Sequence, residues 1–537
     1  MYKDIEVVEF GSSEYTELIA RETRSYGGFT LPMQTTLEAI AKRCKSVVIE
    51  KDYVDKDFQD EYAAYYSKAF KTYSPRCTRL HFFSTSIAPT NKYDFSKYSQ
   101  ESYLGFVVLR PTDLQRMGRT VLRPLIGKPD INFITCVAPY SAHLFGREFQ
   151  INAMPFIQQD TQVGVCAQAS LWMLGRYMSR RFNYREFLPA EINQFAKSHT
   201  AEGRLYPAEK GLTRTQMLDA LQAMGLSATF YEFESMDGYE NYGKQFAKVF
   251  PVRKKSTRDR NRTAKLADIA YRYIESKLPV IFTTTDHALV GIGHSYDYKK
   301  KAKMAIERIP SFFVNNDAAG PYLEMPIFSK KRGLQSFSRA DNIIVVMPHE
   351  ATLCGEEAEN TVRSWIDLLL AQPSANLKRG TLRDDLIRER KEFRRYFKRL
   401  EYRTYLIPSV QLQEELMNEL AHKPTNQVAA TLLQIDYPKF IWITEVSCAE
   451  LLNFADKTRR KCLGRVIVDS TAPKNTNSLI ALHFADILTI WDRQGKKAPD
   501  PFHVPYTTPF VHRFTTRIDE RTTTGSSAAS ASGTNPL

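Results

Sequence analysis

The sequence predicts an α+β protein that is divided into several domains. Its 537 residues are too many for one ordinary domain, and about three domains are expected from this length. Hydrophobic residues make up 43% of the chain and charged residues 25%, which is typical of soluble globular proteins. Apolar positions at helical spacing and short apolar runs typical of strands follow one another in blocks, which indicates the α+β class.

The expected boundaries follow changes in composition and pattern along the chain. An N-terminal α+β domain of unknown role is expected over 1–150, a central domain over 151–350 and a C-terminal α+β domain over 351–515. The last stretch, 516–537, is low in complexity and rich in Ser, Ala, Gly and Thr. A segment of this composition cannot bury a core, so we expect it to be disordered.

The N-terminal region is expected to carry one helix and four strands. Residues 57–70 place Tyr62, Tyr65 and Phe70 at helical spacing. The apolar runs that we interpret as strands are 46–50, 80–85, 103–111 and 131–138. No catalytic constellation is visible here, and Cys136 alternates with apolar neighbours as a core residue does.

The central region changes from helices to strands along its length. Helices are expected from Cys166 onward, over 213–225 with a capping box of Thr213 and Gln216, and over 267–278. The basic stretch 252–265 is expected to be a solvent-exposed loop or helix start. The strands expected next are 278–285, 287–296 and 311–317. A helical first half followed by an antiparallel second half is the order of a papain-like fold.

The C-terminal region begins near Cys354. Residues 383–406 are densely charged, with Leu386, Phe393, Phe397 and Leu400 on one stripe, and they are interpreted as a long exposed helix. Strands are expected over 439–446 and 464–471, and the run 478–491 is apolar throughout.

Charge and cysteine content restrict the classes of function. The net charge is +14, from 74 Lys and Arg against 60 Asp and Glu, so nucleic acid is a possible partner, although an ordinary basic surface is favoured. The seven cysteines are scattered singly with no CxxC, so no zinc site, other metal site or disulfide framework is indicated. No apolar run reaches the length of a membrane span and the N-terminus lacks a signal peptide, so a cytoplasmic protein is expected.

Cys166 is the candidate nucleophile. Gly164 allows a tight turn before it, and Ala169, Trp172 and Met173 follow at helical offsets, so a helix is expected to start at or just before the thiol. Unpaired N–H groups and the helix dipole at that end favour the thiolate, which is the attacking form. A glutamine a few residues upstream can donate to an oxyanion.

The partners of the thiol are expected on the strands that follow. His287 lies about 120 residues after Cys166, at the start of a strand, in the cysteine-then-histidine order of papain-type enzymes. The small residues Gly291 and Gly293 are expected to leave room for the helix that bears the thiol. Asn316 or Asp317, at the end of the next strand, can accept the imidazole N–H and fix its tautomer. His294 is interpreted as structural.

The segments QQDTQVGVCAQASLWM, HALVGIGHSYD and FFVNNDAAGPY resemble the papain-like cysteine peptidases related to the bacteriocin double-glycine leader peptidases. The resemblance covers about 150–350 and implies a bacterial papain-like peptidase domain there. Counting back four residues from the turn glycine Gly320 selects Asn316, with Asp317 as the alternative. The family spacing selects Gln159 as the oxyanion donor, with Gln158 and Gln162 as alternatives that are expected to be near-neutral surface positions.

The resulting expectation is a cytoplasmic thiol peptidase without a cofactor that cleaves a peptide or isopeptide bond of a protein or peptide substrate. Cys166, His287, Asn316 and Gln159 are its expected catalytic residues. Hydrolysis and acyl transfer are both compatible with these residues. The alternative is a non-catalytic papain-like scaffold that binds a partner or nucleic acid through its basic surface.

Overall fold

The computed structural model describes most of the chain up to residue 511. The described residues are 5–23, 30–88, 93–112, 117–124, 126–128, 130–159, 166–197, 211–232, 255–284, 287–300, 302, 304–329, 335–371, 400–452, 461–473, 478–484, 487–491, 502–503 and 510–511. The expected tail 516–537 and the residues 383–399 of the expected charged helix lie outside this set.

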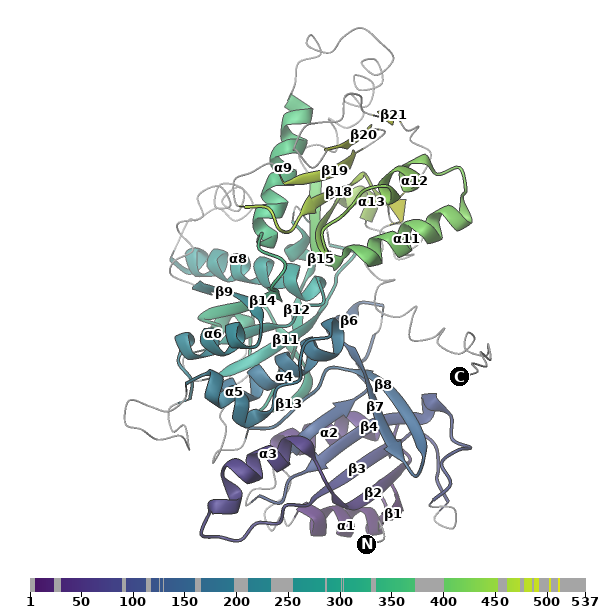
Figure 1. The fold of residues 1–537 in the computed structure, drawn as a ribbon, viewed down its shortest axis with the longest axis vertical. Helices are drawn as coiled ribbons and strands as arrows, with labels where there is room; N and C mark the ends of the chain where they lie inside the picture. Colours follow the sequence, from purple (N-terminus) through teal and green to yellow (C-terminus); the bar gives the residue numbers. More distant parts are fainter. Residues whose placement is uncertain are drawn as a thin grey trace, which may run out of the picture.

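Helices and antiparallel sheets follow one another along the chain, which confirms the α+β class. The structure is elongated, with an N-terminal sheet at one end, a central sheet, and a C-terminal sheet at the other end (Figure 1). The expected limits of the three domains stay a prediction. The larger of two buried apolar clusters among the described residues extends through all three parts, from Ile5 to Trp491, so the parts are packed against one another.

The N-terminal sheet has five antiparallel strands in the order β1-β2-β3-β4-β5. The strands are β1 (Ile5–Glu9), β2 (Ser46–Tyr53), β3 (Cys77–Phe83), β4 (Tyr103–Leu109) and β5 (Met117–Leu122). The helices are α1 (Ser13–Thr23), α2 (Leu31–Ala41) and α3 (Lys56–Ala64). Asp55 caps α3 by accepting from the N–H groups of Asp57 and Phe58, and the helix ends before Tyr65, earlier than the expected 57–70.

A hairpin connects the N-terminal sheet to the central region. It consists of β7 (Ala138–Leu144) and β8 (Arg147–Ala153), in which buried and exposed residues alternate strictly. Phe149 of its buried face stacks on Tyr103 with ring centroids 4.8 Å apart, so the hairpin covers the N-terminal sheet. The short strand β6 (Asn132–Ile134) precedes the hairpin and pairs with the central sheet instead.

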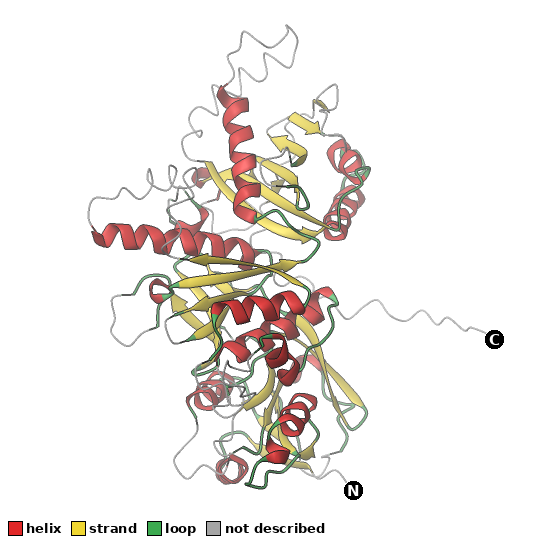
Figure 2. Ribbon diagram, turned by 60° about the vertical axis from the view of Figure 1, so that its left-hand side comes forward, coloured by secondary structure: helices red, strands yellow, loops and turns green. Residues whose placement is uncertain are grey.

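The central sheet has the strand order β13-β12-β11-β10-β14-β9, with β6 beside β11. Its strands are β9 (Leu226–Glu232), β10 (Val280–Thr283), β11 (Ala288–Ser295), β12 (Ser311–Asn316), β13 (Gly320–Pro326) and β14 (Asn342–Pro348). Its helices are α4 (Cys166–Phe182), α5 (Pro189–Phe195), α6 (Arg214–Ala223) and α8 (Lys255–Glu275). The helices α4 and α8 lie on opposite faces of the sheet (Figures 1 and 2).

The C-terminal sheet has the order β15-β16-β18-β19-β20-β21. Its strands are β15 (Leu400–Pro408), β16 (Phe440–Cys448), β18 (Gly464–Asp469), β19 (Leu479–Phe484), β20 (Ile487–Ile490) and β21 (Phe502–His503), and β17 (Lys461–Cys462) pairs with β22 (Phe510–Val511). Its helices are α9 (Gly355–Ala371), α11 (Ser409–His422), α12 (Gln427–Leu433) and α13 (Ala449–Leu452). In both terminal parts the first strand of the sheet is followed by two helices and then by an antiparallel strand that pairs with it.

Two sequence interpretations are wrong at the junction of the central and C-terminal parts. Residues 400–406 belong to a strand, β15, and not to the end of a helix. The charged side chains Glu401 and Arg403 of this strand are buried because each has an ionic partner on the central part, Arg308 and Glu275.

The second error concerns the basic stretch 252–265. Within α8, which contacts both the central sheet and β15, Asn261 and Thr263 are buried and Arg262 and Lys265 are half-buried. The expected exposure of the whole stretch is therefore wrong for its last residues.

Candidate active site

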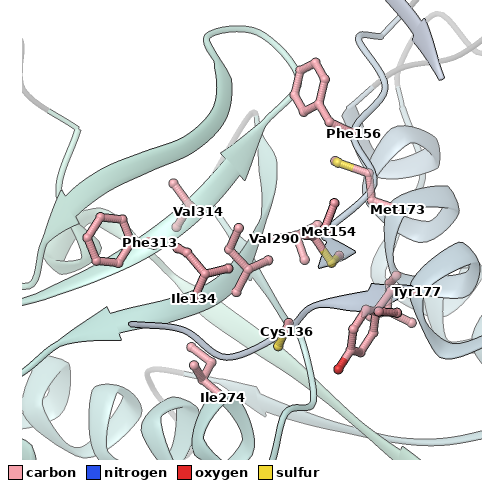
Figure 3. Packing of buried hydrophobic residues seen from close by; sticks show 14 of the residues in the cluster. Ile134, Cys136, Met154, Phe156, Met173, Tyr177, Ile274, Val290, Phe313 and Val314 are labelled. Carbon is pink, nitrogen blue, oxygen red and sulfur yellow. The ribbon is translucent and has the colours of Figure 1, made fainter. Parts of the chain in front are cut away.

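Cys166 is the first residue of α4 and is half-buried, as the sequence predicts for a helix-terminal thiol. The residues from Ala167 to Ser179 are buried along the helix. Met173 and Tyr177 of α4 belong to the same buried cluster as Val290 of β11, and α4 contacts this strand (Figure 3). The thiol therefore stands at the positive end of a helix that is fixed by its own core.

His287 directly precedes β11 and lies beside the thiol. Its carbonyl oxygen accepts a hydrogen bond from the Thr284 backbone N–H at 2.8 Å, which closes the turn from β10. Burial lowers the pKa of His287, but the hydrogen bond with Cys166, the charge of Asp317 and the hydrogen bond with Asn316 outweigh it and raise the pKa to about 9. The imidazole is thus held in its protonated form at neutral pH, next to the candidate nucleophile.

Asn316 ends β12 and faces the far side of the same imidazole. Its Oδ1 lies 2.8 Å from His287 Nε2. The Ala318 backbone N–H donates to this Oδ1 at 3.0 Å, and Asn316 Nδ2 donates to Gln335 Oε1 at 2.8 Å. Because a backbone N–H only donates, the oxygen of the Asn316 amide must face the ring, and Nε2 must carry a proton. The other ring nitrogen, Nδ1, is then available to exchange a proton with the thiol.

Asp317 is a second acidic neighbour of the ring. Its Oδ1 lies 3.5 Å from His287 Nε2, which is long for a hydrogen bond, so the contact is mainly electrostatic. Asp317 is fully buried, and among the described residues its carboxylate has no hydrogen bond of good geometry, although the backbone N–H groups of Asp317 and Ala318 are near enough to lower its pKa. Burial raises the pKa of Asp317 to about 6, although the charge of His287 opposes the shift. At neutral pH the carboxylate therefore supports the imidazolium.

Asn315, the neighbouring amide, points away from the ring. Its Nδ2 donates to the Pro155 carbonyl at 3.1 Å, and its Oδ1 accepts from the Tyr322 N–H at 3.0 Å. Successive side chains of a strand point to opposite faces, so only one of the two asparagines can reach His287. The structure brings together Cys166, His287 and Asn316, with Asp317 adjacent.

Two of the three glutamine candidates can be placed. Gln158 is buried, and its Oε1 accepts a hydrogen bond from the Met117 N–H of β5 at 3.0 Å. Arg110 donates to the Gln158 carbonyl at 2.8 Å. Gln158 is therefore a structural residue, and its interpretation as a near-neutral surface position is wrong. Gln159 is half-buried, and no described residue bonds its side-chain amide; Gln162 lies outside the described residues.

Five of the other six cysteines are poor nucleophiles, because burial raises the pKa of their thiols. Burial raises the pKa of Cys44 and Cys136 to about 12 and the pKa of Cys354 to about 11. Burial also raises the pKa of Cys77 and Cys462 strongly. Cys354 is the only other half-buried cysteine, because the remaining five of the seven are buried.

The two glycines of β11 make room for strands and not for α4. A Cβ at Gly291 would lie 2.4 Å from the Phe282 ring of β10. A Cβ at Gly293 would lie 2.2 Å from the Phe133 carbonyl oxygen of β6. Their small size is required for packing inside the sheet, so the expectation that they accommodate the thiol-bearing helix is wrong.

His294 has a structural role, as expected. Its Nε2 lies 2.7 Å from the Glu275 carboxylate of α8, and its side chain is buried. In the part of the chain that the structure describes, no group of three or more His, Cys, Asp or Glu side chains is arranged to hold a metal ion.

The N-terminal part forms contacts with α4, the helix that bears Cys166, that the sequence does not reveal. Trp172 Nε1 donates to Asp57 Oδ1 at 3.1 Å, and Arg176 forms a buried ion pair with the same carboxylate. Arg176 also bonds Glu186 at 2.8 Å. Asp57 belongs to α3 and is separated from α4 by more than a hundred residues, so periodicity along the chain carries no signal for this contact.

Comparisons of this chain with protein-family models, with curated proteins and with solved structures found no match. No helix among the described residues is long and apolar enough to cross a membrane. The function must therefore be inferred from the geometry of the site.

Proposed function

We propose that the protein is a papain-like thiol peptidase that cleaves a peptide or isopeptide bond. The observation that carries the proposal is the placement of His287 between the Cys166 thiol and the Asn316 amide, with Nε2 committed to Asn316 Oδ1. A nucleophile, a base and a group that orients the base are the elements that covalent acyl chemistry requires.

In the proposed reaction the Cys166 thiolate attacks the carbonyl carbon of the scissile bond. The negative charge that develops on the carbonyl oxygen is stabilised by the Cys166 backbone N–H and the Gln159 side-chain amide. Protonated His287 donates its Nδ1 proton to the leaving amine, and the acyl group stays on the sulfur as a thioester. Neutral His287 then takes a proton from water, which attacks the thioester and releases the acid.

The two polar neighbours of His287 have different roles in this reaction. Asn316 keeps Nε2 protonated and directs Nδ1 toward the thiol, because its amide is oriented by the Ala318 N–H at Oδ1 and by Gln335 at Nδ2. Asp317 stabilises the positive charge of the ring without a good hydrogen bond. An amine in place of water would give acyl transfer with the same residues.

The proposal is tested by mapping cleavage in proteins of a cell extract. The purified chain is incubated with the extract, and new N-termini are identified by mass spectrometry in parallel with Cys166→Ala and Cys354→Ala. We expect new N-termini with the wild type and with Cys354→Ala, which has the matched half-buried thiol, and none with Cys166→Ala. Identical N-termini from all three proteins would favour the non-catalytic scaffold.

A further inference from the structure

A cavity of about 480 Å³ lies where the N-terminal and central parts meet. Its walls come from α2, from the segment that follows β5, and from β12 and β13. The helix α2 packs directly on β13, next to the turn at Gly320 (Figure 1). A volume of this size is within the range of about 300–1,000 Å³ that small-molecule sites occupy, and such sites favour domain junctions.

Most of the wall is apolar. Ile40 of α2, Leu122 of β5, Phe313 of β12 and Leu323 of β13 line the cavity together with Ile126. Several polar groups of the wall already have partners within the protein. The Thr36 hydroxyl donates to the Pro32 carbonyl, the Asn132 amide to the Gly127 carbonyl, and the Ser295 hydroxyl bonds Ser311.

The cationic groups of the wall differ, because they have no such partners. Arg123 and Lys128 both line the cavity, and no residue that the structure describes forms an ion pair with either side chain. Arg123 is half-buried. Burial lowers the pKa of Arg123. The negative charge of Glu101 raises this pKa, and the positive charge of Arg43 lowers it. Half-buried Arg123 and exposed Lys128 thus place two cationic groups beside an apolar cavity, a setting in which an anion is favourable.

Glu324 is the acidic residue of the wall. Its carboxylate accepts a hydrogen bond from the Ser311 hydroxyl at 2.6 Å. The charged residues that line the cavity are therefore two cations and one anion that is already hydrogen-bonded. This balance favours a ligand that carries a single negative group on an apolar body.

We propose that this cavity is a binding site for a small amphipathic anion, with a carboxylate or phosphate head at Arg123 and Lys128 and an alkyl body among Ile40, Phe313 and Leu323. Such a ligand would touch α2 and β13 at once and so bridge the N-terminal and central parts. The site is separate from the proposed peptidase site, and its test does not depend on peptidase activity.

The test is isothermal titration calorimetry of the full chain with decanoate, monodecyl phosphate and decyltrimethylammonium below their micelle concentrations. We expect saturable binding of one ligand per chain for at least one of the two anions, and none for the cation of equal chain length. The preferred anion distinguishes a carboxylate ligand from a phosphate ligand. Arg123→Met should weaken binding at least about tenfold, because a charge-assisted hydrogen bond is lost.

Three variants control the interpretation. Arg76→Met removes the same charge at an exposed position outside the cavity wall and should leave binding unchanged. Ala39→Trp places an indole at the cavity from an exposed position of α2, so it should abolish binding while the helix stays intact. Glu324→Gln removes the opposing charge and should tighten binding severalfold. All variants are first compared with the wild type by circular dichroism and thermal unfolding.

The proposal is overturned if neither anion binds saturably, or if the cation binds as well as the anions. It is also overturned if folded Arg123→Met or folded Ala39→Trp binds the anion as tightly as the wild type. Loss of binding in Arg76→Met would show that net charge, and not this cavity, governs the interaction.

Discussion

His287 meets an amide and a carboxylate at the same ring nitrogen. Asn316 Oδ1 is 2.8 Å from Nε2 and Asp317 Oδ1 is 3.5 Å from it. The sequence predicts that either Asn316 or Asp317 accepts the His287 N–H. It does not decide between them, because they are adjacent and the answer depends on the length of the turn before Gly320. The structure gives the hydrogen bond to Asn316 and leaves Asp317 as a buried charge beside it.

The charge of Asp317 should be measurable through the His287 titration. Asp317→Asn removes a negative charge that raises the pKa of His287, so the midpoint should fall below the wild-type value of about 9. NMR of histidine-labelled protein, with the signal assigned by His287→Gln, measures the midpoint. Asp297→Asn, at an exposed aspartate, is the control and should leave it unchanged. An identical midpoint in Asp317→Asn would contradict the electrostatic role.

The raised pKa of His287 also makes the stability of the protein depend on pH. A group with a raised pKa in the folded state stabilises it fully below the ordinary value of 6.5, and this contribution is lost as pH rises through about 9. The difference in unfolding free energy between wild type and His287→Gln should therefore shrink from pH 6 to about pH 9.5. Urea unfolding at both pH values measures it, and a difference that grows with pH would show that the imidazole is not held protonated.

At the scale of single elements, the Cys166-bearing helix α4 is the part that the sequence predicts best. The start at Cys166 follows from a turn glycine and from apolar residues at offsets of three and four, which are local signals. The anchors of α4 are not local. Trp172 and Arg176 bond Asp57 of α3, and the segment before the helix is pinned to β5 through Gln158. Local sequence patterns therefore predict the helix α4, but they do not predict the contacts with distant residues that fix its position.

The neighbouring glutamines Gln158 and Gln159 should separate stability from catalysis. Gln158→Ala leaves the buried Met117 N–H without its acceptor and should destabilise the protein by about 1–3 kcal/mol. Gln159→Ala should lower kcat by roughly a hundredfold or more with little change in KM, because an oxyanion donor acts in the transition state.

Thermal unfolding measures the stability of each variant. Its kcat and KM are measured with a peptide that contains a cleavage site found in the cell-extract experiment. Gln222→Ala, at an exposed position, is the control for both measurements. A normal kcat in Gln159→Ala would remove this residue from the oxyanion site. Full stability in Gln158→Ala would contradict its structural role.

For the molecule as a whole, buried charges join the central and C-terminal parts. Arg308 is fully buried and forms two hydrogen bonds of 2.7 Å with Glu401 of β15. Arg403 of the same strand pairs with Glu275 of α8 and with Glu445. Charged residues in this buried strand give a sequence pattern similar to that of a solvated helix, so the sequence predicts a helix where residues 400–406 form a strand. Their partners are distant in sequence and become visible only in the folded structure.

Breaking one of these pairs should be costly. Arg308→Met leaves the Glu401 carboxylate buried without its counter-charge, and a loss of about 3–5 kcal/mol in unfolding free energy is expected. Arg21→Met, in an exposed pair with Glu6, is the matched control and should cost no more than about 1 kcal/mol. Denaturant unfolding compares them. Equal effects of the two substitutions would contradict the structural importance of the buried pair.

The central claim is that Cys166 is a nucleophile activated by His287, and the most direct test is the rate of its alkylation. The folded chain is treated with iodoacetamide at pH 7, and the labelling of each cysteine peptide is followed by mass spectrometry. We expect Cys166 to react far faster than half-buried Cys354, whose pKa is raised to about 11, and to lose this advantage in His287→Ala. Equal labelling of Cys166 and Cys354, or a Cys166 rate unchanged by His287→Ala, would contradict the account.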